Sequence, residues 1–402
     1  MTTPSIGKAK TRNSVLEIFW IFLKLGLTSF GGPIAHLGYF RQEFVIQRRW
    51  LNDHAYADLV ALCQFLPGPA SSQVGIAIGL SRGGYAGAFA SWLGFTLPSF
   101  LALVVFALLL TNIHDLADAV WLHGLKVAAV AVVAQALWGM GKSLCPDAKR
   151  ASLAVASAIV LAFMPGVAGQ VAVIVTAGII GWFWLSSDIA LPHIQLDIPI
   201  SKRTGVILLG FLFVALTVLP LLAADGGYLL QLFDSFFRTG ALVFGGGHVV
   251  LPLLQAEIVP HGWVSNDLFL AGYGAAQAVP GPLFTFAGYL GAVSPASPNA
   301  WIGGIVALVA IFLPAFLLIL GALPWWETAR HYPGMQRAML GINAAVVGLL
   351  LAAFYHPVWT SGILSAPDFA LAALAFLLLA FWKLPPWVVV VLCAALAGLG
   401  WH

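Results

Sequence analysis

Long apolar segments recur along almost the entire chain, and they restrict its fold more than any other feature. A helix of about twenty apolar residues can cross the ~30 Å hydrocarbon core of a bilayer. Charged residues make up only 8% of the 402 residues, where about 25% is usual, so they could not cover a water-soluble globule. We therefore predict an all-α polytopic membrane protein with spanning helices at 84–110, 121–141, 151–164, 167–185, 204–224, 299–324, 335–355, 368–383 and 385–401.

The rest of the composition excludes several other classes of protein. The net charge of +3 comes from short scattered clusters of cations, which do not indicate nucleic-acid binding. Cys63, Cys145 and Cys393 lie too far apart to suggest a zinc site or a disulfide framework. The segment 79–83 fits the G-x-S-x-G pattern of hydrolases, but no strand precedes it. We therefore expect a protein that is not an enzyme and that has no metal or other cofactor.

Two motifs occur twice along the chain in the same order. Phe30–Gly32 recurs as Phe244–Gly246, and Pro67–Pro69 recurs as Pro280–Pro282. Such ordered coincidences predict two homologous repeats. The expected organisation is an N-terminal segment (1–13) without a signal-peptide cleavage pattern, a first repeat (14–185), a polar loop with a linking transmembrane helix (186–228) and a second repeat (229–402).

Basic residues have the opposite distribution in the two repeats. Loops 48–50 and 142–150 are basic, whereas their counterparts in the second repeat contain no Lys or Arg. Because basic loops stay on the cytoplasmic side, we expect these segments inside: 1–13, 48–50, 142–150, 186–203 and 327–337. The expected outside segments are 111–120, 225–228, 260–267, 356–368 and the C-terminus. The repeats are thus predicted to be inverted relative to each other, as in many secondary transporters.

Each repeat also contains two pairs of short helices that are interrupted by Gly and Pro. These residues end helices because Pro lacks an N–H and Gly permits positive φ. We predict two broken, re-entrant hairpins in each repeat, with breaks at Phe30–Pro33, Pro67–Pro69, Phe244–Gly247 and Pro280–Pro282. Interrupted backbone in a membrane must be buried in protein or line a cavity. Helix N-termini that meet near the midplane would favour an anion.

Polar residues near the breaks are candidates for a binding site. Lys24 and Arg238 occupy matching positions in apolar helices, where they would either bind substrate or extend to the interface. Glu43 and Glu257 are candidates for proton coupling, although neutralisation of Arg41 and other local cations would also explain them. The predicted substrate-binding residues are Lys24, Gly31, Gly32, His36, Gln64, Gly68, Ser71, Ser72, Gln73, Arg238, Gly245, Gly246, His248, Gln277, Gly281 and Thr285, with Asn343 as a further candidate.

These motifs resemble the signature of the chromate ion transporter family. The residues that carry the resemblance are Phe30–Pro33, Ala35, His36, Glu43, Arg49, Trp50, Leu66–Pro69 and Gln73, and then Phe244–His248, Trp263, Gln277 and Pro280–Pro282. The resemblance covers nearly the whole chain. It implies a two-domain inner-membrane carrier that exports chromate and confers resistance. His248 follows a triple glycine where the family often has an aromatic residue, so the resemblance assigns it no special role.

The resulting expectation is a secondary transporter of a tetrahedral oxyanion that works by alternating access. Sulfate has the same shape and charge as chromate, so a sulfate or other oxyanion carrier remains an alternative. A membrane-embedded lipid enzyme or scramblase is a more distant alternative, and it would need a polar groove or an acid pair open to the bilayer. The lipid bilayer and the oxyanion are the expected partners, with no nucleic acid, and a homodimer is left open.

Overall fold

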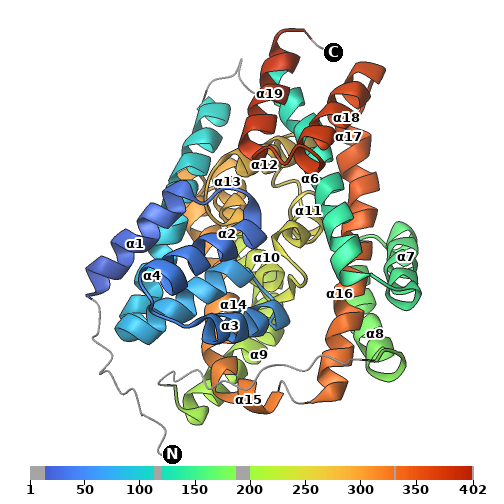
Figure 1. Cartoon of the computed structure of the whole chain (residues 1–402). Coiled ribbons are helices and arrows are strands. Elements are labelled where there is room, and N and C mark those ends of the chain that lie inside the picture. Colours follow the sequence, from blue (N-terminus) through green and yellow to red (C-terminus); the bar gives the residue numbers. More distant parts are fainter. Residues whose placement is uncertain (1–13, 113–119, 187–199, 330–331, 401–402) are drawn as a thin grey trace, which may run out of the picture.

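The computed structural model describes residues 14–112, 120–186, 200–329 and 332–400, and every regular element in these ranges is helical (Figure 1). The N-terminal segment 1–13, most of the expected loops 111–120 and 186–203, and the last two residues lie outside the described residues.

The first half contains α1 (Val15–Thr28), α2 (Gly32–Arg41), the π-helix η1 (Gln42–Gln47), α3 (Asp53–Phe65), α4 (Ala70–Asn112), α6 (Val120–Leu144), α7 (Ala148–Phe163) and α8 (Val167–Trp184). Helix α9 (Lys202–Ala224) links it to the second half. The second half contains α10 (Tyr228–Leu242), η2 (Gly247–Val249), α11 (Val250–Ile258), α12 (Asn266–Ala278), η3 (Leu283–Thr285), α13 (Phe286–Val293), α14 (Ala300–Ala322), η4 (Leu323–Trp325), α15 (Trp326–Ala329), α16 (Pro333–Ala353), η5 (Phe354–Trp359), α17 (Thr360–Gly362), α18 (Ala366–Ala380) and α19 (Pro386–Gly398).

Helix α4 is a folded hairpin rather than one straight rod. Gly84 has φ 65° and ψ −156°, which interrupts the helix. A methyl group at Gly79 would lie 2.3 Å from the carbonyl oxygen of Gly87, so the chain folds back on itself around Gly84. Helices α13 and α14 form the matching hairpin of the second half, where Gly291 and Gly303 approach each other equally closely.

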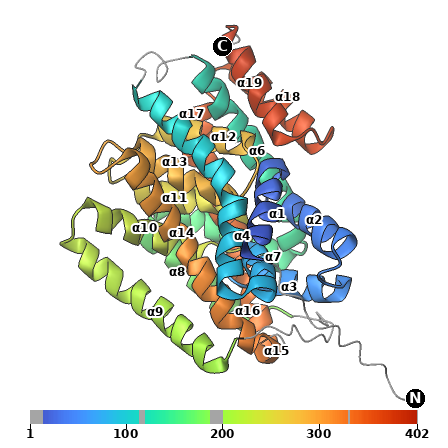
Figure 2. The same ribbon diagram turned by 90° about the vertical axis from the view of Figure 1, so that its left-hand side faces the viewer.

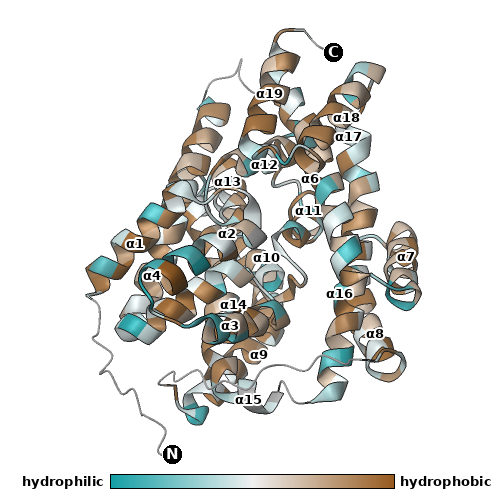
Figure 3. Ribbon diagram, in the orientation of Figure 1, coloured by the Kyte–Doolittle hydropathy of each residue, from teal (hydrophilic) through white to brown (hydrophobic). Residues whose placement is uncertain are grey.

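Within the described residues, six helical segments are long and apolar enough to cross a membrane, and the chain is a multi-pass membrane protein. They comprise α4, α6, α8, α9, α14 with η4, and α16 with η5 and α17. Apolar residues predominate along these helices (Figure 3). Three of the nine predicted spanning helices are not among these six, because α7, α18 and α19 have only 16, 15 and 13 residues.

Corresponding helices of the two halves run in opposite directions (Figures 1 and 2). The part of α4 after Gly84 runs towards the end of the molecule that carries α18 and α19, whereas α14 runs away from it. Helix α6 starts near that end, and its counterpart α16 runs towards it.

The two halves are also interlocked. Helix α16 packs against α7 and α8 of the first half, and α6 packs against α18 and α19 of the second half. Small residues make these contacts close: a methyl group at Gly341 would lie 2.1 Å from the carbonyl oxygen of Ala177, and one at Gly124 would lie 2.4 Å from that of Cys393. Such residues let helix backbones approach closely where lipid offers no hydrophobic driving force.

Close contacts at glycine residues also join the first helix of each half to the long helix beside it, α10 to α14 and α1 to α4. A methyl group at Gly240 on α10 would lie 2.1 Å from the carbonyl oxygen of Ile311 on α14. Gly26 on α1 meets Phe95 on α4 in the same way, at 2.7 Å. By contrast, α9 lies on the outside of the molecule (Figure 2) and is only 17% buried in its apolar part.

We predict that Gly240→Ala lowers the thermal unfolding midpoint in detergent, because the added methyl group must push α10 away from α14. Overpacking of this kind costs about 1–3 kcal/mol. Gly210→Ala on α9 is the matched control, since nothing lies within 4 Å of the added methyl group. An equal midpoint for both variants would show that the α10–α14 contact is not tight.

Candidate functional site

The four helix breaks meet through two matching backbone hydrogen bonds between the halves. The N–H of Gly68 donates to the carbonyl oxygen of Val243 at 2.6 Å, and the N–H of Gly281 donates to that of Ser29 at 3.0 Å. Val243 and Ser29 directly precede the corresponding breaks that start at Phe244 and Phe30. Each Pro-Gly-Pro break is therefore bonded to the Gly-rich break of the other half.

The Gly-rich breaks also contact each other. A methyl group at Gly247 would lie 3.0 Å from Cγ of Pro33, and one at Gly32 would lie 3.9 Å from Nε2 of His248. The Pro-Gly-Pro breaks rest on corresponding positions of the long helices. Gly281 faces Ser99 on α4, and Gly68 faces Ala315 on α14.

Glycine is required at these turns because the backbone adopts positive φ. The angles are 100° at Gly31 and 74° at its counterpart Gly245, and 114° at Gly68 and 104° at its counterpart Gly281. Residues other than glycine rarely adopt this region. The repeated sequence motif thus encodes the same backbone turn in both halves.

At three of the four breaks, the helix that follows has a bare N-terminus. Helix α2 and the short helices η2 and η3 have no side-chain cap. The helices that lead towards the Pro-Gly-Pro breaks are capped at their start: Asn52 accepts from the N–H of Ala55 at 2.7 Å, and Ser265 accepts from that of Leu268 at 3.3 Å. Uncapped first-turn N–H groups remain available to an anion.

Several buried polar atoms at or beside the breaks have no hydrogen-bond partner among the described residues: Ser29 Oγ, Ser72 Oγ, Gln73 Oε1, Gln277 Nε2 and Asn343 Oδ1. The Asn343 oxygen is 3.6 Å from a methyl group placed at Gly245, so α16 also contributes to this region. Buried polar groups are rarely left unpaired. Those that can donate, namely the two hydroxyl groups and the amide of Gln277, suit a bound anion.

Other predicted residues are bonded within the protein. A hydrogen bond of 3.3 Å joins Nδ1 of His36 to Oγ of Ser71, and one of 2.9 Å joins Nδ1 of His248 to the hydroxyl of Tyr273. The Gln73 amide donates to the carbonyl oxygen of Pro67, and the Thr285 hydroxyl donates to that of Pro282, both at 2.8 Å. These bonds brace the breaks. Gln64, the counterpart of Gln277, is exposed.

The predicted cations do not form a matching pair at the breaks. Lys24 is exposed on α1. Arg238 binds two carboxylates: Nε is 2.9 Å from Oδ2 of Asp234, and Nη1 is 2.7 Å from Oε1 of Glu257. Glu43 pairs with Arg48 at 2.6 Å. Glu43 thus neutralises a local cation other than Arg41, which bonds Asp53 instead.

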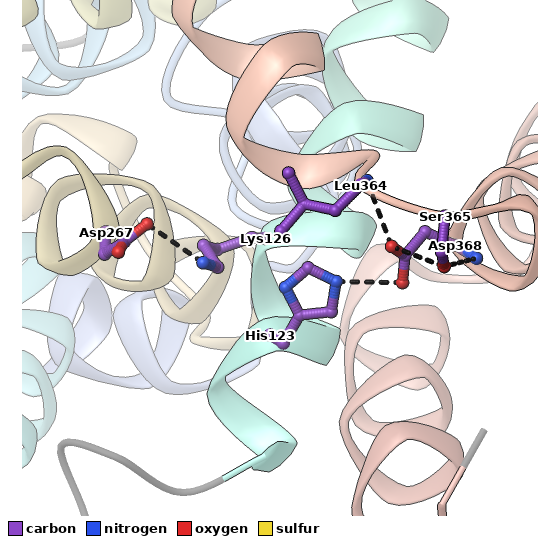
Figure 4. Close-up of polar contacts among 6 residues, drawn as sticks. All are labelled: His123, Lys126, Asp267, Leu364, Ser365 and Asp368. Carbon is purple, nitrogen blue, oxygen red and sulfur yellow. Dashed lines mark hydrogen bonds and ion pairs between the residues drawn. The ribbon is translucent and has the colours of Figure 1, made fainter. Parts of the chain in front are cut away.

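Sequence reasoning missed polar pairs that join the halves (Figure 4). On α6, Nε2 of His123 lies 2.8 Å from Oδ1 of Asp368, and Nζ of Lys126 lies 2.9 Å from Oδ1 of Asp267. The backbone N–H of Leu364 and the hydroxyl of Ser365 hold the other oxygen of Asp368. These partners are too far apart in the sequence for any local pattern to link them.

Comparison with known proteins gives the family. The sequence pattern of the chromate transporter family matches this chain twice, over residues 16–182 and again over residues 230–399. The chain belongs to the chromate transporter family. The double match indicates that both halves of this chromate transporter family member are copies of one family domain.

Relatives align with both halves together. The chromate transport protein of Pseudomonas aeruginosa is 28% identical over 348 residues, which cover 83% of this chain and 79% of that protein. The chromate transport protein of Cupriavidus metallidurans is 26% identical and covers 95% of this chain and 92% of its own length. The uncharacterized transporter MJ0718 of Methanocaldococcus jannaschii is 29% identical, with 86% and 85% covered. No solved structure matches the chain.

We predict that Gly281→Ala destabilises the protein more than Gly262→Ala does. Both glycines have positive φ, but only the methyl group at Gly281 meets another atom, Ser99 Oγ at 2.8 Å. Strain in this backbone region costs about 1–3 kcal/mol, and the contact adds to it. Thermal unfolding of the two purified variants measures the difference. Equal midpoints would mean that the break is loosely packed.

Proposed function

We propose that this protein exports chromate, a tetrahedral dianion, and binds it where the four helix breaks meet. The observation that carries the proposal is the matched pair of backbone hydrogen bonds, Gly68 to Val243 and Gly281 to Ser29, which holds the breaks together. The names of the Pseudomonas and Cupriavidus relatives support chromate as the substrate.

The chemistry of the breaks fits an oxyanion. Each bare helix N-terminus offers several N–H groups and about half a positive charge from the helix dipole. The buried hydroxyl groups of Ser29 and Ser72 and the amide of Gln277 can add hydrogen bonds to the four oxygens of the anion. Hydrogen bonds to a charged group contribute about 1.5–3 kcal/mol each.

The opposite directions of corresponding helices support transport by alternating access. In the proposed topology the repeats 14–185 and 229–402 are inverted in the membrane, the N-terminus is cytoplasmic and the C-terminus is outside. The broken hairpins enter from opposite faces and end at the shared site. Rocking of one repeat against the other would then expose the site to each side in turn.

The membrane potential favours export from the cytoplasm through the inner membrane. An inside-negative potential of 100 mV contributes about 2.3 kcal/mol per elementary charge, or about 4.6 kcal/mol for a dianion. Export against a moderate gradient therefore needs no nucleotide. Continuous export would lower cytoplasmic chromate and give the cell resistance to it.

A lipid-directed activity has less support. The groove between α4 and α14 has a volume of about 480 Å³ and is lined by apolar side chains apart from Thr96. An enzyme or scramblase would need a polar path or an acid pair at such a surface. The groove is instead suited to contact with apolar groups.

Flux measurements with purified protein in liposomes test the proposal. We expect chromate to cross the membrane faster than in empty liposomes and in the direction set by an imposed potential. Sulfate is the comparison substrate. Equal rates for both anions would favour a general oxyanion carrier, and a chromate rate equal to that of empty liposomes would rule out chromate transport.

We predict that Gln277→Leu separates binding from stability. The buried Nε2 of Gln277 has no partner among the described residues, so an apolar side chain of similar size should leave the unfolding midpoint unchanged or raised. Chromate binding should weaken about tenfold or more because one donor to the anion is lost. Gln47→Leu, at an exposed position, is the control. Unaltered chromate affinity in Gln277→Leu would exclude this side chain from the site.

A further inference from the structure

The second half contains a cluster of two buried carboxyl groups, Asp234 and Glu257, around the partly buried Arg238, whose side chain is 24% exposed. We call these three residues the carboxylate triad. Arg238 bonds Asp234 at 2.9 Å and Glu257 at 2.7 Å. Both acidic residues are only 3% exposed. The triad joins α10 to α11, the two helices that flank the Gly-rich break at Phe244–Gly247.

The charges of the triad do not balance. Two ionised carboxylates and one guanidinium carry a net charge of −1, and an uncompensated charge is costly away from water. In addition, Oδ1 of Asp234 is buried and has no hydrogen-bond partner among the described residues. A single proton on one of the two carboxyl groups would remove the net charge. It would also turn that carboxyl group into a hydrogen-bond donor.

The surrounding elements offer little else to neutralise the triad. Helix α10 packs against α9, α11 and α14, and α11, which carries Glu257, also packs against η2, α8, α12 and α16. Of these, α8 has no titratable side chain, Asp267 of α12 pairs with Lys126, Tyr273 of α12 bonds His248 of η2, and Arg337 of α16 donates to the carbonyl oxygen of Pro333. Helix α14 has no titratable side chain, and α9 has Lys202 and Arg203 only in its first turn, with Asp225 exposed after its last residue. His261 lies beside Glu257, since its Nδ1 is 2.6 Å from the backbone oxygen of that residue.

The corresponding place in the first half is different. Trp20 occupies the position of Asp234, and Glu43 corresponds to Glu257. Glu43 pairs with Arg48, which also lies 3.7 Å from Glu17, but the side chains of Arg48 and Glu17 are 34% and 46% exposed. Water can compensate charge there, so the argument for a bound proton applies to the second half alone.

We propose that the carboxylate triad binds one exchangeable proton, held by either Asp234 or Glu257, and that this proton raises the affinity of the neighbouring break for its anion. This second part rests on the proposed function. Arg238 is four residues before the end of α10, or about 6 Å along the helix axis. The triad is therefore close to the break that follows α10. When the net charge of the triad changes from −1 to zero, its repulsion of a bound dianion is removed, and the bound dianion in turn strengthens proton binding.

Infrared spectroscopy tests the proton without any substrate. Difference spectra of wild type against Asp234→Asn and Glu257→Gln should show a protonated-carboxyl band in the wild type that is lost in each variant. The band should shift in D2O and disappear as the pH is raised. The exposed Asp53, paired with Arg41, provides the control Asp53→Asn, which should retain the band.

Three results would overturn the proton site: no protonated-carboxyl band that depends on Asp234 or Glu257, a band that survives in both variants, or a band that neither exchanges nor titrates. Arg238→Met gives an independent check, because without the cation both carboxyl groups should hold protons and the band should grow. A band of unchanged size in that variant would also contradict the charge argument.

Chromate binding at alkaline pH, where chromate remains a dianion, tests the link to the anion. Wild-type affinity should fall about tenfold as the triad loses its proton, whereas Asp234→Asn, with a permanently neutral triad, should stay constant over the same range. Parallel pH dependence in both proteins would refute the link. If neither protein binds chromate at any pH, the proposed function fails while the infrared result still decides the proton site.

Discussion

Backbone amide and carbonyl groups at the helix breaks have no helical partner, and a membrane interior offers no water to replace one. In this structure, backbone groups at the breaks of one half form hydrogen bonds with backbone groups of the other half. Gly68 and Gly281 donate across to the residues that precede the opposite breaks, while α6 and α16 each pack against the last two helices of the other half. Each half therefore supplies a backbone partner to a break of the other, so the proposed site depends on the contact between the halves.

The two halves share a backbone plan but differ in their polar side chains. The positive φ angles of the breaks recur at matching glycines, and the close contacts of Gly26 and Gly240 recur as well. Side chains at matching positions have diverged: Lys24 is exposed, whereas Arg238 binds two carboxylates. The backbone geometry of the breaks is therefore the same in both halves, whereas the charged side chains near them differ.

The helical class, the repeat and the positions of all four breaks could be predicted from the sequence, because Gly and Pro impose local backbone limits that a duplicated motif shows twice. Contacts between residues far apart in the sequence could not be predicted, as the pairs His123 with Asp368 and Lys126 with Asp267 show. The ion pair of Arg238 with Asp234 could have been predicted, because the two residues are four apart on one helix. The end of α18 was predicted too late, because the apolar sequence continues for a few residues beyond the last residue of the helix.

The central claim is that the four breaks together form one oxyanion site. A structure determined with bound chromate tests it most directly. The account predicts density for a tetrahedral anion between the Gly-rich and Pro-Gly-Pro breaks, within hydrogen-bond distance of N–H groups from both halves. Density found only beside exposed cations such as Lys24, with the breaks closed on one another, would contradict it.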